Sequence, residues 1–408
     1  MKTMHRRCAG LDVHQQEIVA CARRVRGKKA SHDVRRFATT TAGLLALADW
    51  LEEQHVTHVA MEATGVYWKP VWHILESRFT LILANAAHVK NVPGRKSDVN
   101  DATWISDLLA HGLIRASFVP PAPIQDLRDL TRTRTELRRE IARHSQRIQS
   151  ALEEANIKLT SVITDILGMS GRRMLAAIVA GESDASRLAD LGSSRLTAPR
   201  EALVAALTGR IRDHHRFLIG QHLKTIEQIE TTIVEFDARV EAALAPFRDA
   251  VERLKEIPGI SRTAAEIIIA EIGADMSQFP SADHLVSWAG LCPRLDESAG
   301  KRRSTRIRKG ATWLKPLLVQ SALAASRKKN SSFKSRYHSL KGRIGPKKAA
   351  IAVAANLLRV VYHMLKDGTC YQDLGIDYRR PRNPNRAATN LANRIRALGY
   401  DVDIRRAA

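Results

Sequence analysis

The sequence predicts an α/β domain at its N-terminal end, then a long helical arm, then a mostly α-helical C-terminal domain. Short apolar runs alternate with helix-like periodicity up to about residue 115. Apolar residues then recur at alternating steps of three and four along residues 127–155, and a Pro-Gly turn separates two further helical patterns near residue 258. At 408 residues the chain is long enough for two or three domains with real cores. We place domains at residues 1–118, 119–250 and 251–371, followed by a basic tail at residues 372–408.

The N-terminal elements follow from the position of their β-rich runs. We predict strands at residues 8–13, 17–25, 34–38, 57–61 and 80–84, a helix at residues 41–53, and helical pattern on both sides of the last two strands. The order is three strands, a helix, a strand, a helix, a strand and a helix. That order is typical of an RNase H-like domain.

Acidic residues follow two of these strands, and an acidic pair opens the last helix. Asp12 and Glu62 each end an apolar run, and Asp98 and Asp101 are three residues apart, so on a helix they share one face. Carboxylates this close repel each other, and a divalent cation is the usual way to hold them together. All four could instead be solvated surface acids. Their places on the first strand, the fourth strand and a late helix favour an oxygen-ligated metal site, because these are the places of the acids in an RNase H-like domain.

The composition is strongly basic, with a formal net charge of +23 and an isoelectric point of about 10.3. Such an excess favours a polyanionic partner, with nucleic acid first. We expect no membrane association, because no apolar run approaches the roughly 18 residues of a spanning helix, and no signal-peptide pattern opens the chain. The cysteines are scattered, as is typical of reduced thiols in a cytoplasmic protein: Cys8, Cys21, Cys292 and Cys370. We expect the protein to be cytoplasmic and to associate with the nucleoid when it acts.

Two helical seams predict the arm. The first seam is Leu127, Leu130, Arg134, Leu137, Ile141, His144, Ile148, Ala151 and Ala155; the second is Leu223, Ile226, Ile229, Ile233, Phe236 and Val240. Because residues 181–200 between them are broken by Gly, Ser, Asp and Pro, we expect an antiparallel hairpin or a projecting coiled-coil arm. Arg134 at a seam position could tune the helix register or meet a phosphate. We assign Arg134 and Arg138 to nucleic-acid contact, with a solvated helical face as the alternative.

Residues 254–273 predict a helix, a Pro-Gly-Ile turn and a second helix. This is the helix-hairpin-helix pattern, in which hairpin amides and the next helix N-terminus hold a DNA phosphate without reading bases. Gly259 permits the tight turn, and Ser261 or Thr263 could cap the second helix. We assign Gly259, Ser261 and Arg262 to phosphate contact, with a plain helical hairpin as the alternative.

Ser298 lies in a Ser-Ala-Gly turn directly before a dense basic run. A serine hydroxyl is a poor nucleophile unless a base or a metal activates it and cations stabilise the developing charge. The cations that could do so, and that we assign to nucleic-acid contact, are Lys301, Arg302, Arg303, Arg306, Arg308 and Lys309. Local sequence alone does not separate Ser298 from Ser304.

The chain resembles, nearly end to end, the DEDD transposases of bacterial insertion sequences, which are bridge-RNA-guided recombinases. The motifs that carry the resemblance are Gly10-Leu-Asp-Val-His, Met61-Glu-Ala-Thr-Gly, Lys96-Ser-Asp-x-x-Asp-Ala, Leu127-Arg-x-Leu-Thr-Arg, Ile257-Pro-Gly-Ile, Ala289-Gly-Leu-x-Pro-Arg with Ser298-x-Gly, and Lys347-Lys-Ala-x-x-Ala-x-Ala-x-x-Leu-Leu. One departure is Ala299, where a serine or glycine is common. The family's acidic tetrad corresponds to Asp12, Glu62, Asp98 and Asp101, and its nucleophile to Ser298.

The resemblance implies an RNase H/RuvC-like domain that binds Mg²⁺, or Mn²⁺ in its place, through the four carboxylates. It also implies that Ser298 attacks a DNA phosphate and forms a phosphoserine link. In the family the composite site is completed between protomers of a homo-tetramer (a dimer of dimers), and a structured RNA pairs with donor and target DNA.

Two rival interpretations remain open. One is a metal-dependent RuvC-like Holliday-junction nuclease in which water attacks the phosphate. The other is a non-catalytic binding protein descended from such an enzyme, against which the competent residues at all five positions argue. At the C-terminal end we expect residues 349–365 to form a core helix. The basic residues 378–386 would contact nucleic acid or form a disordered tail, with a short helix near residues 388–398.

Overall fold

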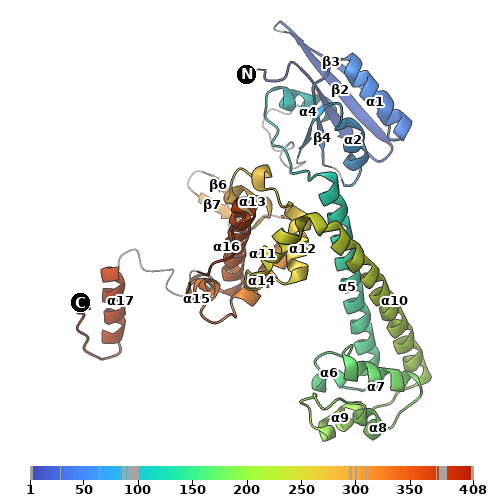
Figure 1. Cartoon of the computed structure of the whole chain (residues 1–408), viewed down its shortest axis with the longest axis vertical. Helices are drawn as coiled ribbons and strands as arrows, with labels where there is room; N and C mark the ends of the chain where they lie inside the picture. Colours follow the sequence, from blue (N-terminus) through green and yellow to red (C-terminus); the bar gives the residue numbers. More distant parts are fainter. Residues whose placement is uncertain are drawn as a thin grey trace. The chain divides into compact units, whose positions relative to one another are not determined.

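The computed structural model describes residues 3–27, 29–63, 65–84, 89, 101–293, 296–298, 301–304, 306–307, 310–373, 375 and 384–405. Of residues 296–298, 301–303, 384 and 386–387 it describes the backbone only. The chain divides into two compact units, Met1–Val119 and Pro120–Ala408, and Figure 1 shows the elements of each.

The first unit is a mixed α/β domain. Its elements are β1 (Arg7–Val13), β2 (Glu17–Arg26), β3 (Lys29–Ala38), α1 (Thr41–Glu53), β4 (His58–Glu62), α2 (Trp68–Leu75), β5 (Thr80–Ala84) and α4 (Asp101–Ala110). The sheet order is β3-β2-β1-β4-β5; β1, β2 and β3 are antiparallel, while β1, β4 and β5 are parallel. The predicted strands and helix are confirmed. Only β3 differs: its first five residues are mostly polar and exposed, yet they pair with β2, so the strand is longer than predicted.

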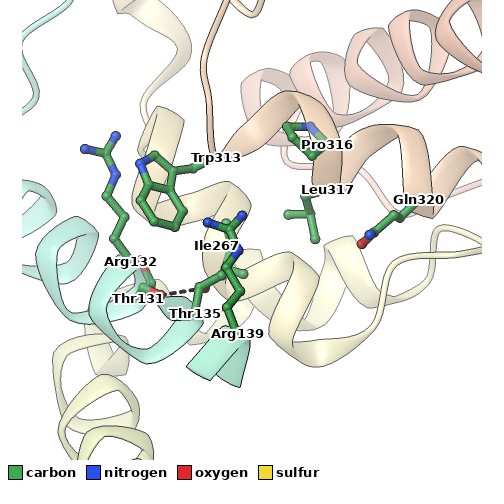
Figure 2. A pocket seen from close by; sticks show the side chains of 9 residues that line it. All are labelled: Thr131, Arg132, Thr135, Arg139, Ile267, Trp313, Pro316, Leu317 and Gln320. Atoms are coloured by element: carbon green, nitrogen blue, oxygen red, sulfur yellow. Dashed lines mark hydrogen bonds between the residues drawn. The ribbon is translucent and has the colours of Figure 1, made fainter. Parts of the chain in front are cut away.

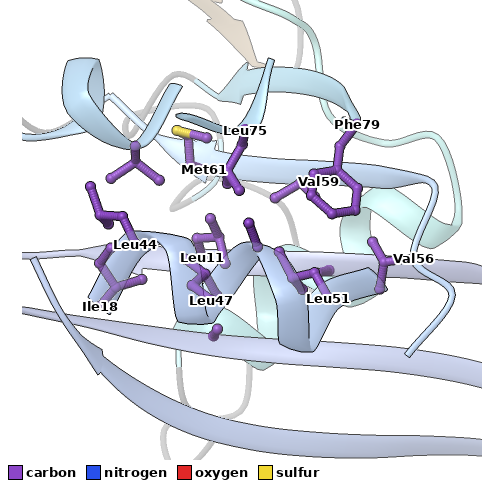
Figure 3. Close-up of a cluster of buried hydrophobic side chains, with 14 of the residues drawn as sticks. Leu11, Ile18, Leu44, Leu47, Leu51, Val56, Val59, Met61, Leu75 and Phe79 are labelled. Atoms are coloured by element: carbon purple, nitrogen blue, oxygen red, sulfur yellow. The ribbon is translucent and has the colours of Figure 1, made fainter. Parts of the chain in front are cut away.

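Each face of the sheet is covered by helices. On one face, α1 and α2 cover a core that includes Leu11, Leu47, Met61 and Leu75, all buried (Figure 3). Burying side chains of this size stabilises the fold by about 1.5–3 kcal/mol each. On the other face, α4 covers Cys8 and its neighbours. Burial raises the pKa of the Cys8 thiol to about 12, so it stays protonated and unreactive.

The second unit is mostly helical. Its elements are α5 (Ala122–Glu154), α6 (Leu159–Val162), α7 (Met169–Val179), α8 (Ala185–Asp190), α9 (Arg200–Leu207), α10 (Asp213–Ala243), η1 (Ala245–Phe247), α11 (Arg248–Lys255), α12 (Arg262–Ile272), η2 (Met276–Gln278), α13 (Ala282–Trp288), β6 (Asp296–Ser298), β7 (Lys301–Ser304), α14 (Leu314–Ala325), α15 (Ser332–Ile344), α16 (Pro346–Asp367) and α17 (Pro384–Arg396).

The long helices α5 and α10 lie side by side and antiparallel, as the two seams predicted (Figure 1). Ile148 and Ile226 are buried in the seam, and His144 meets His222 across it with 3.0 Å between their Nδ1 atoms. The helices α6 to α9 complete a separate apolar cluster at the far end of this pair, and the sequence did not predict them. The predicted seam positions therefore lie between the two long helices. The segment between the seams, which was predicted only as an interruption of the helical pattern, forms short helices.

Among the described helices, α16 is the one long and apolar enough to cross a membrane. Most of its apolar residues are instead buried against α13, α14 and α15, with Val353, Leu357 and Val361 fully covered. The prediction of a core helix at this place is confirmed. The short C-terminal helix is also present as α17, while residues 378–383 of the basic segment lie outside the described residues.

Candidate active site and nucleic-acid contacts

The sheet places two of the predicted acids at the same end of neighbouring strands. β1 and β4 pair in parallel with Leu11 opposite Met61, so Asp12 and Glu62 are the next residue on each strand. Successive strand side chains point to opposite faces. Because Leu11 and Met61 lie in the core under α1 and α2, Asp12 and Glu62 belong to the opposite face, which α4 covers.

Helix α4 brings a third acid to this face. Asp101 is its first residue, and the following Ala102 packs against Val19 and Cys21 of β2. The helix lies so close to the sheet that a Cβ on Gly10 would stand 2.2 Å from the Ala102 carbonyl oxygen. Only a glycine two residues before Asp12 allows this approach. Gly10 is thus a positioning residue that the sequence alone did not identify.

A half-buried ion pair anchors α4 further along. Asp107 accepts a hydrogen bond from Arg23 Nε at 2.7 Å, and it also lies 3.0 Å from His32 Nε2. Arg23 is only 5% exposed while the Asp107 side chain is 33% exposed, so this contact is partly shielded from water. The start of α4, with Asp101, is therefore fixed over β1 by a close backbone contact. The later part of α4 is held to the sheet by the ion pair between Asp107 and Arg23.

Close to the acids, His14 Nε2 lies 3.1 Å from Asp12 Oδ2. Nothing in the sequence distinguishes His14 from the other histidines, although its place two residues after Asp12 keeps it on the same side of an extended chain. Across the part of the chain that the structure describes, no three His, Cys, Asp or Glu side chains gather as a metal site would need. Asp98, the fourth predicted ligand, lies outside the described residues.

Replacing Gly10 with alanine should lower both stability and any activity that depends on the three acids. The new methyl group would push against the Ala102 carbonyl and against the Ser106 amide at 2.5 Å, and backbone cannot rotate away as a side chain can. We expect a loss of about 1–3 kcal/mol in the free energy of unfolding, typical of overpacking. Thermal unfolding followed by circular dichroism measures it. Gly342→Ala is the control, because Gly342 has open space around it and no positive φ; an equal loss there would contradict the argument.

Ser298 ends the first strand of a small hairpin. β6 and β7 are antiparallel with Ser298 opposite Lys301, and a bridge between Pro293 and Ile307 closes the base of the hairpin. Arg306 is exposed, and its backbone amide donates to Ser304 Oγ at 3.2 Å. The side chains of Ser298, Lys301, Arg302 and Arg303 are not described, and Arg308 and Lys309 lie outside the described residues. The backbone therefore supports a serine in a basic hairpin, and the role of these cations stays a prediction.

The two helices α11 and α12 and the turn between them form as predicted. Ser261 caps α12 by accepting a hydrogen bond from the Ala264 amide at 3.2 Å, so the predicted cap is confirmed. Gly259 has a φ of +84°, and a Cβ there would lie 2.2 Å from the Ser321 carbonyl oxygen of α14. Internal packing accounts for this glycine, and phosphate contact by the turn stays a prediction. Arg262 forms ion pairs with Glu241 and Glu266.

Arg134 must be removed from the candidate nucleic-acid contacts. It is only 2% exposed, and its guanidinium donates to Asp237 at 2.8 Å and to Glu266 at 2.7 Å. A buried guanidinium between two carboxylates is not available to a phosphate. Its seam position instead serves helix register, the other possibility that the sequence left open. Arg138 stays a candidate for nucleic-acid contact, because its side chain is 44% exposed. Its guanidinium lies 3.7 Å from Asp237.

Two further arginines of α5 join the arm to the C-terminal helices. Arg132 binds the buried Glu271 through both Nε and Nη2, at 2.7 and 2.9 Å. Arg128 donates to the backbone carbonyls of Ala270 and Glu271 at the end of α12. Cationic groups at a helix C-terminus satisfy carbonyls that lack partners within the helix. The arm and α12 are therefore tied together by charge-assisted hydrogen bonds.

Trp313 extends this connection to α14. The guanidinium carbons of Arg132 and Arg139 lie 5.7 and 4.8 Å from the centre of its ring, and Figure 2 shows them beside a pocket of about 160 Å³. Such contacts contribute about 0.5–1 kcal/mol each at partly exposed sites. Trp313 directly precedes α14 and lies after the segment that carries Ser298. Its contacts with Arg132 and Arg139 therefore hold the C-terminal end of that segment against the arm.

Comparisons with known proteins give matches to both units. A model of IS110-type DEDD proteins, described as "Transposase", matches residues 9–157, and a model described as "Transposase IS116/IS110/IS902 family" matches residues 251–338; together they span more than half of the chain.

Two curated relatives come from insertion elements. An IS900 protein of 42 kDa from Mycobacterium paratuberculosis is 28% identical over 334 residues, covering 71% of this chain and 80% of the relative. An IS110 protein of 43.6 kDa from Streptomyces coelicolor is 26% identical over 309 residues, covering 69% of this chain and 73% of the relative. Both relatives are named as uncharacterized proteins.

Proposed function

Because this chain belongs to the IS116/IS110/IS902 family of insertion-element transposases, we propose that it cuts and rejoins DNA through a serine nucleophile, with Mg²⁺ and a guide RNA. Cutting and rejoining DNA is what the family implies; the nucleophile, the metal and the guide are our proposal. The observation that carries it is the shared position of Asp12 and Glu62 at the ends of paired strands, on the face that α4 covers.

The proposed metal ligands are Asp12, Glu62, Asp98 and Asp101. Carboxylate oxygens are the donors that Mg²⁺ and Mn²⁺ prefer. When bound, the cation lowers the cost of negative charge at the reacting phosphate. The chain's own contribution is to hold the acids against their mutual repulsion, which the Gly10 contact with α4 and the ion pair of Asp107 support.

The proposed nucleophile is Ser298. Its oxygen would form a bond to phosphorus while the bond from phosphorus to a deoxyribose oxygen breaks, and that sugar oxygen would take up the proton that the serine gives up. Cations of the β6–β7 segment would stabilise the extra charge during this transfer. In the proposed assembly, a homo-tetramer, Ser298 of one protomer completes the acidic site of another.

The guide RNA is proposed because base pairing can select the sequence while the protein recognises only shape and backbone. The net charge of +23 supports contact with nucleic acid of either kind. Candidate contacts are Arg138, Arg262 and Arg306, whose described side chains reach solvent, together with the cations of the hairpin.

Formation of a protein–DNA adduct tests the proposal. The full chain, copurified with its RNA and mixed with DNA of its own element ends, should give a strand covalently attached to protein on a denaturing gel. Chelation with EDTA should abolish the adduct, and added Mg²⁺ or Mn²⁺ should restore it. Asp12→Asn should abolish it as well, whereas the control Asp49→Asn, which changes an exposed acid on α1, should not.

The outcomes separate the alternatives. Metal-dependent cleavage that leaves free ends and no attached protein would favour the nuclease with a water nucleophile. Binding without any cleavage, in Mg²⁺ and with both nucleic acids present, would favour the non-catalytic protein. Adduct formation that survives complete chelation would remove the metal from the proposal.

A further inference from the structure

A groove of about 760 Å³ lies among α13, α15, α16 and the base of the β6–β7 hairpin. Its volume falls within the range of about 300–1,000 Å³ typical of small-molecule sites. Most of its lining is apolar and comes from Val286, Leu291, Ile344, Ile351, Ala352 and Ala355. Pro293 and Ile307, which pair at the base of the hairpin, also line it.

The charged residues of the lining are all cationic: Arg306, Arg336, Lys348 and Arg359. Arg306 and Lys348 are exposed, and among the side chains that the structure describes no acidic one lines the groove. Arg359 donates to Asp283, but that carboxylate is 74% exposed and lies outside the lining. An apolar interior with cations on it fits a ligand that has both an apolar face and negative charge.

Charge excludes the chain's own spare helix as this ligand. α17 has exposed apolar residues, Leu391 and Ile395, that could suit an apolar groove. The same helix carries Arg394 and Arg396 in its last turn, so it would bring positive charge to a positive groove. Duplex DNA also fits poorly, because stacking hides the faces of its bases from an apolar surface.

We propose that this groove holds one unstacked nucleotide, with its base in the apolar interior and its flanking phosphates on Arg306 and Lys348. The inference rests on the proposed action on nucleic acid, and it adds the site at which the protein holds a base that has left the stack. Ser298 is the fifth residue after Pro293. Extended chain of that length spans at most about 17 Å, so the captured nucleotide lies within a few nucleotides of the proposed reacting phosphate.

Fluorescence of 2-aminopurine tests the environment of the base, independently of cleavage. A single-stranded oligonucleotide with one 2-aminopurine between purines is quenched by stacking, and saturation with the full chain should raise its emission several-fold. Ala352→Trp fills the groove and should remove most of that rise. Ala324→Trp is the matched control, since Ala324 is an exposed alanine on α14 outside the lining.

The contribution of charge is tested at two adjacent lysines. Lys348→Glu should weaken oligonucleotide binding about tenfold at low salt, because a phosphate contact becomes a repulsion. Lys347→Glu makes the same change on the neighbouring exposed residue, which does not line the groove, and should weaken binding less. These exposed changes keep the test valid if Ala352→Trp does not fold.

Thiol alkylation gives a second measurement. Cys292 lines the groove and is half-buried, whereas Cys370 is exposed and lies outside it. Bound oligonucleotide should slow the alkylation of Cys292, measured by mass spectrometry, and leave Cys370 unchanged.

Several results would overturn the inference. They are an emission rise that Ala352→Trp leaves intact, equal effects of the two lysine changes, or a Cys292 that bound oligonucleotide does not protect. An emission rise that appears only after deletion of residues 384–408 would assign the groove to α17. Because none of these readouts needs strand cleavage, they can fail while the adduct assay succeeds, and the reverse.

Discussion

Replacing Ser298 with alanine is expected to abolish the covalent protein–DNA link and strand exchange, with nucleic-acid binding unchanged. The change removes one oxygen atom at the end of β6 and leaves the hairpin and its cations in place. Because that oxygen is the proposed nucleophile, no other group can form the same bond. Gel detection of the adduct measures the loss, and a mobility shift with DNA and RNA measures binding.

Ser304→Ala is the matched control for this experiment. Ser304 lies on the partner strand of the same hairpin, and its hydroxyl oxygen accepts a hydrogen bond from the Arg306 amide. Its loss should leave the adduct in place, with a small effect on local structure. If Ser304→Ala removes the adduct and Ser298→Ala does not, the nucleophile is Ser304, which the local sequence favours equally.

Replacing Arg134 with methionine is expected to lower the free energy of unfolding of the helical unit by about 3–5 kcal/mol. Arg134 is buried between Asp237 and Glu266, and Glu266 is itself only 6% exposed. Removing the guanidinium leaves a buried carboxylate with Arg262 as its remaining partner in an ion pair. Chemical denaturation followed by far-ultraviolet circular dichroism measures the change, since most helices belong to this unit.

A comparison with Arg138→Met separates the effect of burial on stability from the effect of losing a positive charge. This arginine lies one turn further along α5 and pairs with the same Asp237, but it is 44% exposed. Exposed ion pairs contribute about 0–1 kcal/mol, so its replacement should cost no more than that. A second variant, Arg134→Met with Glu266→Gln, should recover part of the loss. Equal losses at Arg134 and Arg138 would show that the buried network does not stabilise the arm.

Much of the fold was predictable because its signals are local. Apolar runs of five to ten residues gave all five strands of the first sheet, and the three-four spacing gave both long helices. The polar start of β3 escaped because its pairing with β2, rather than its own pattern, makes it a strand. The helices α6 to α9 escaped because each has eleven residues or fewer, so their stability comes from a shared core rather than from a long periodic pattern.

The candidate site was predictable to a lesser degree. Asp12 and Glu62 could be placed together because parallel strands bring their ends to one edge. Arg134 was misassigned because a sequence shows its charge but not the two acids, more than 100 residues away, that enclose it. The contacts of Gly10 and Trp313 escaped for the same reason, since the residues that define them are distant in the chain.

The cluster at the far end of the arm has a consequence for how such proteins can diversify. Its apolar core is contained between the ends of α5 and α10, whereas the arginine network that ties the arm to α12 lies near the other end of the same helices. Substitutions that reshape the cluster therefore leave that network untouched. Sequence changes can therefore accumulate in this cluster as in a separate module, without disturbing the arginine contacts at the opposite end of the arm.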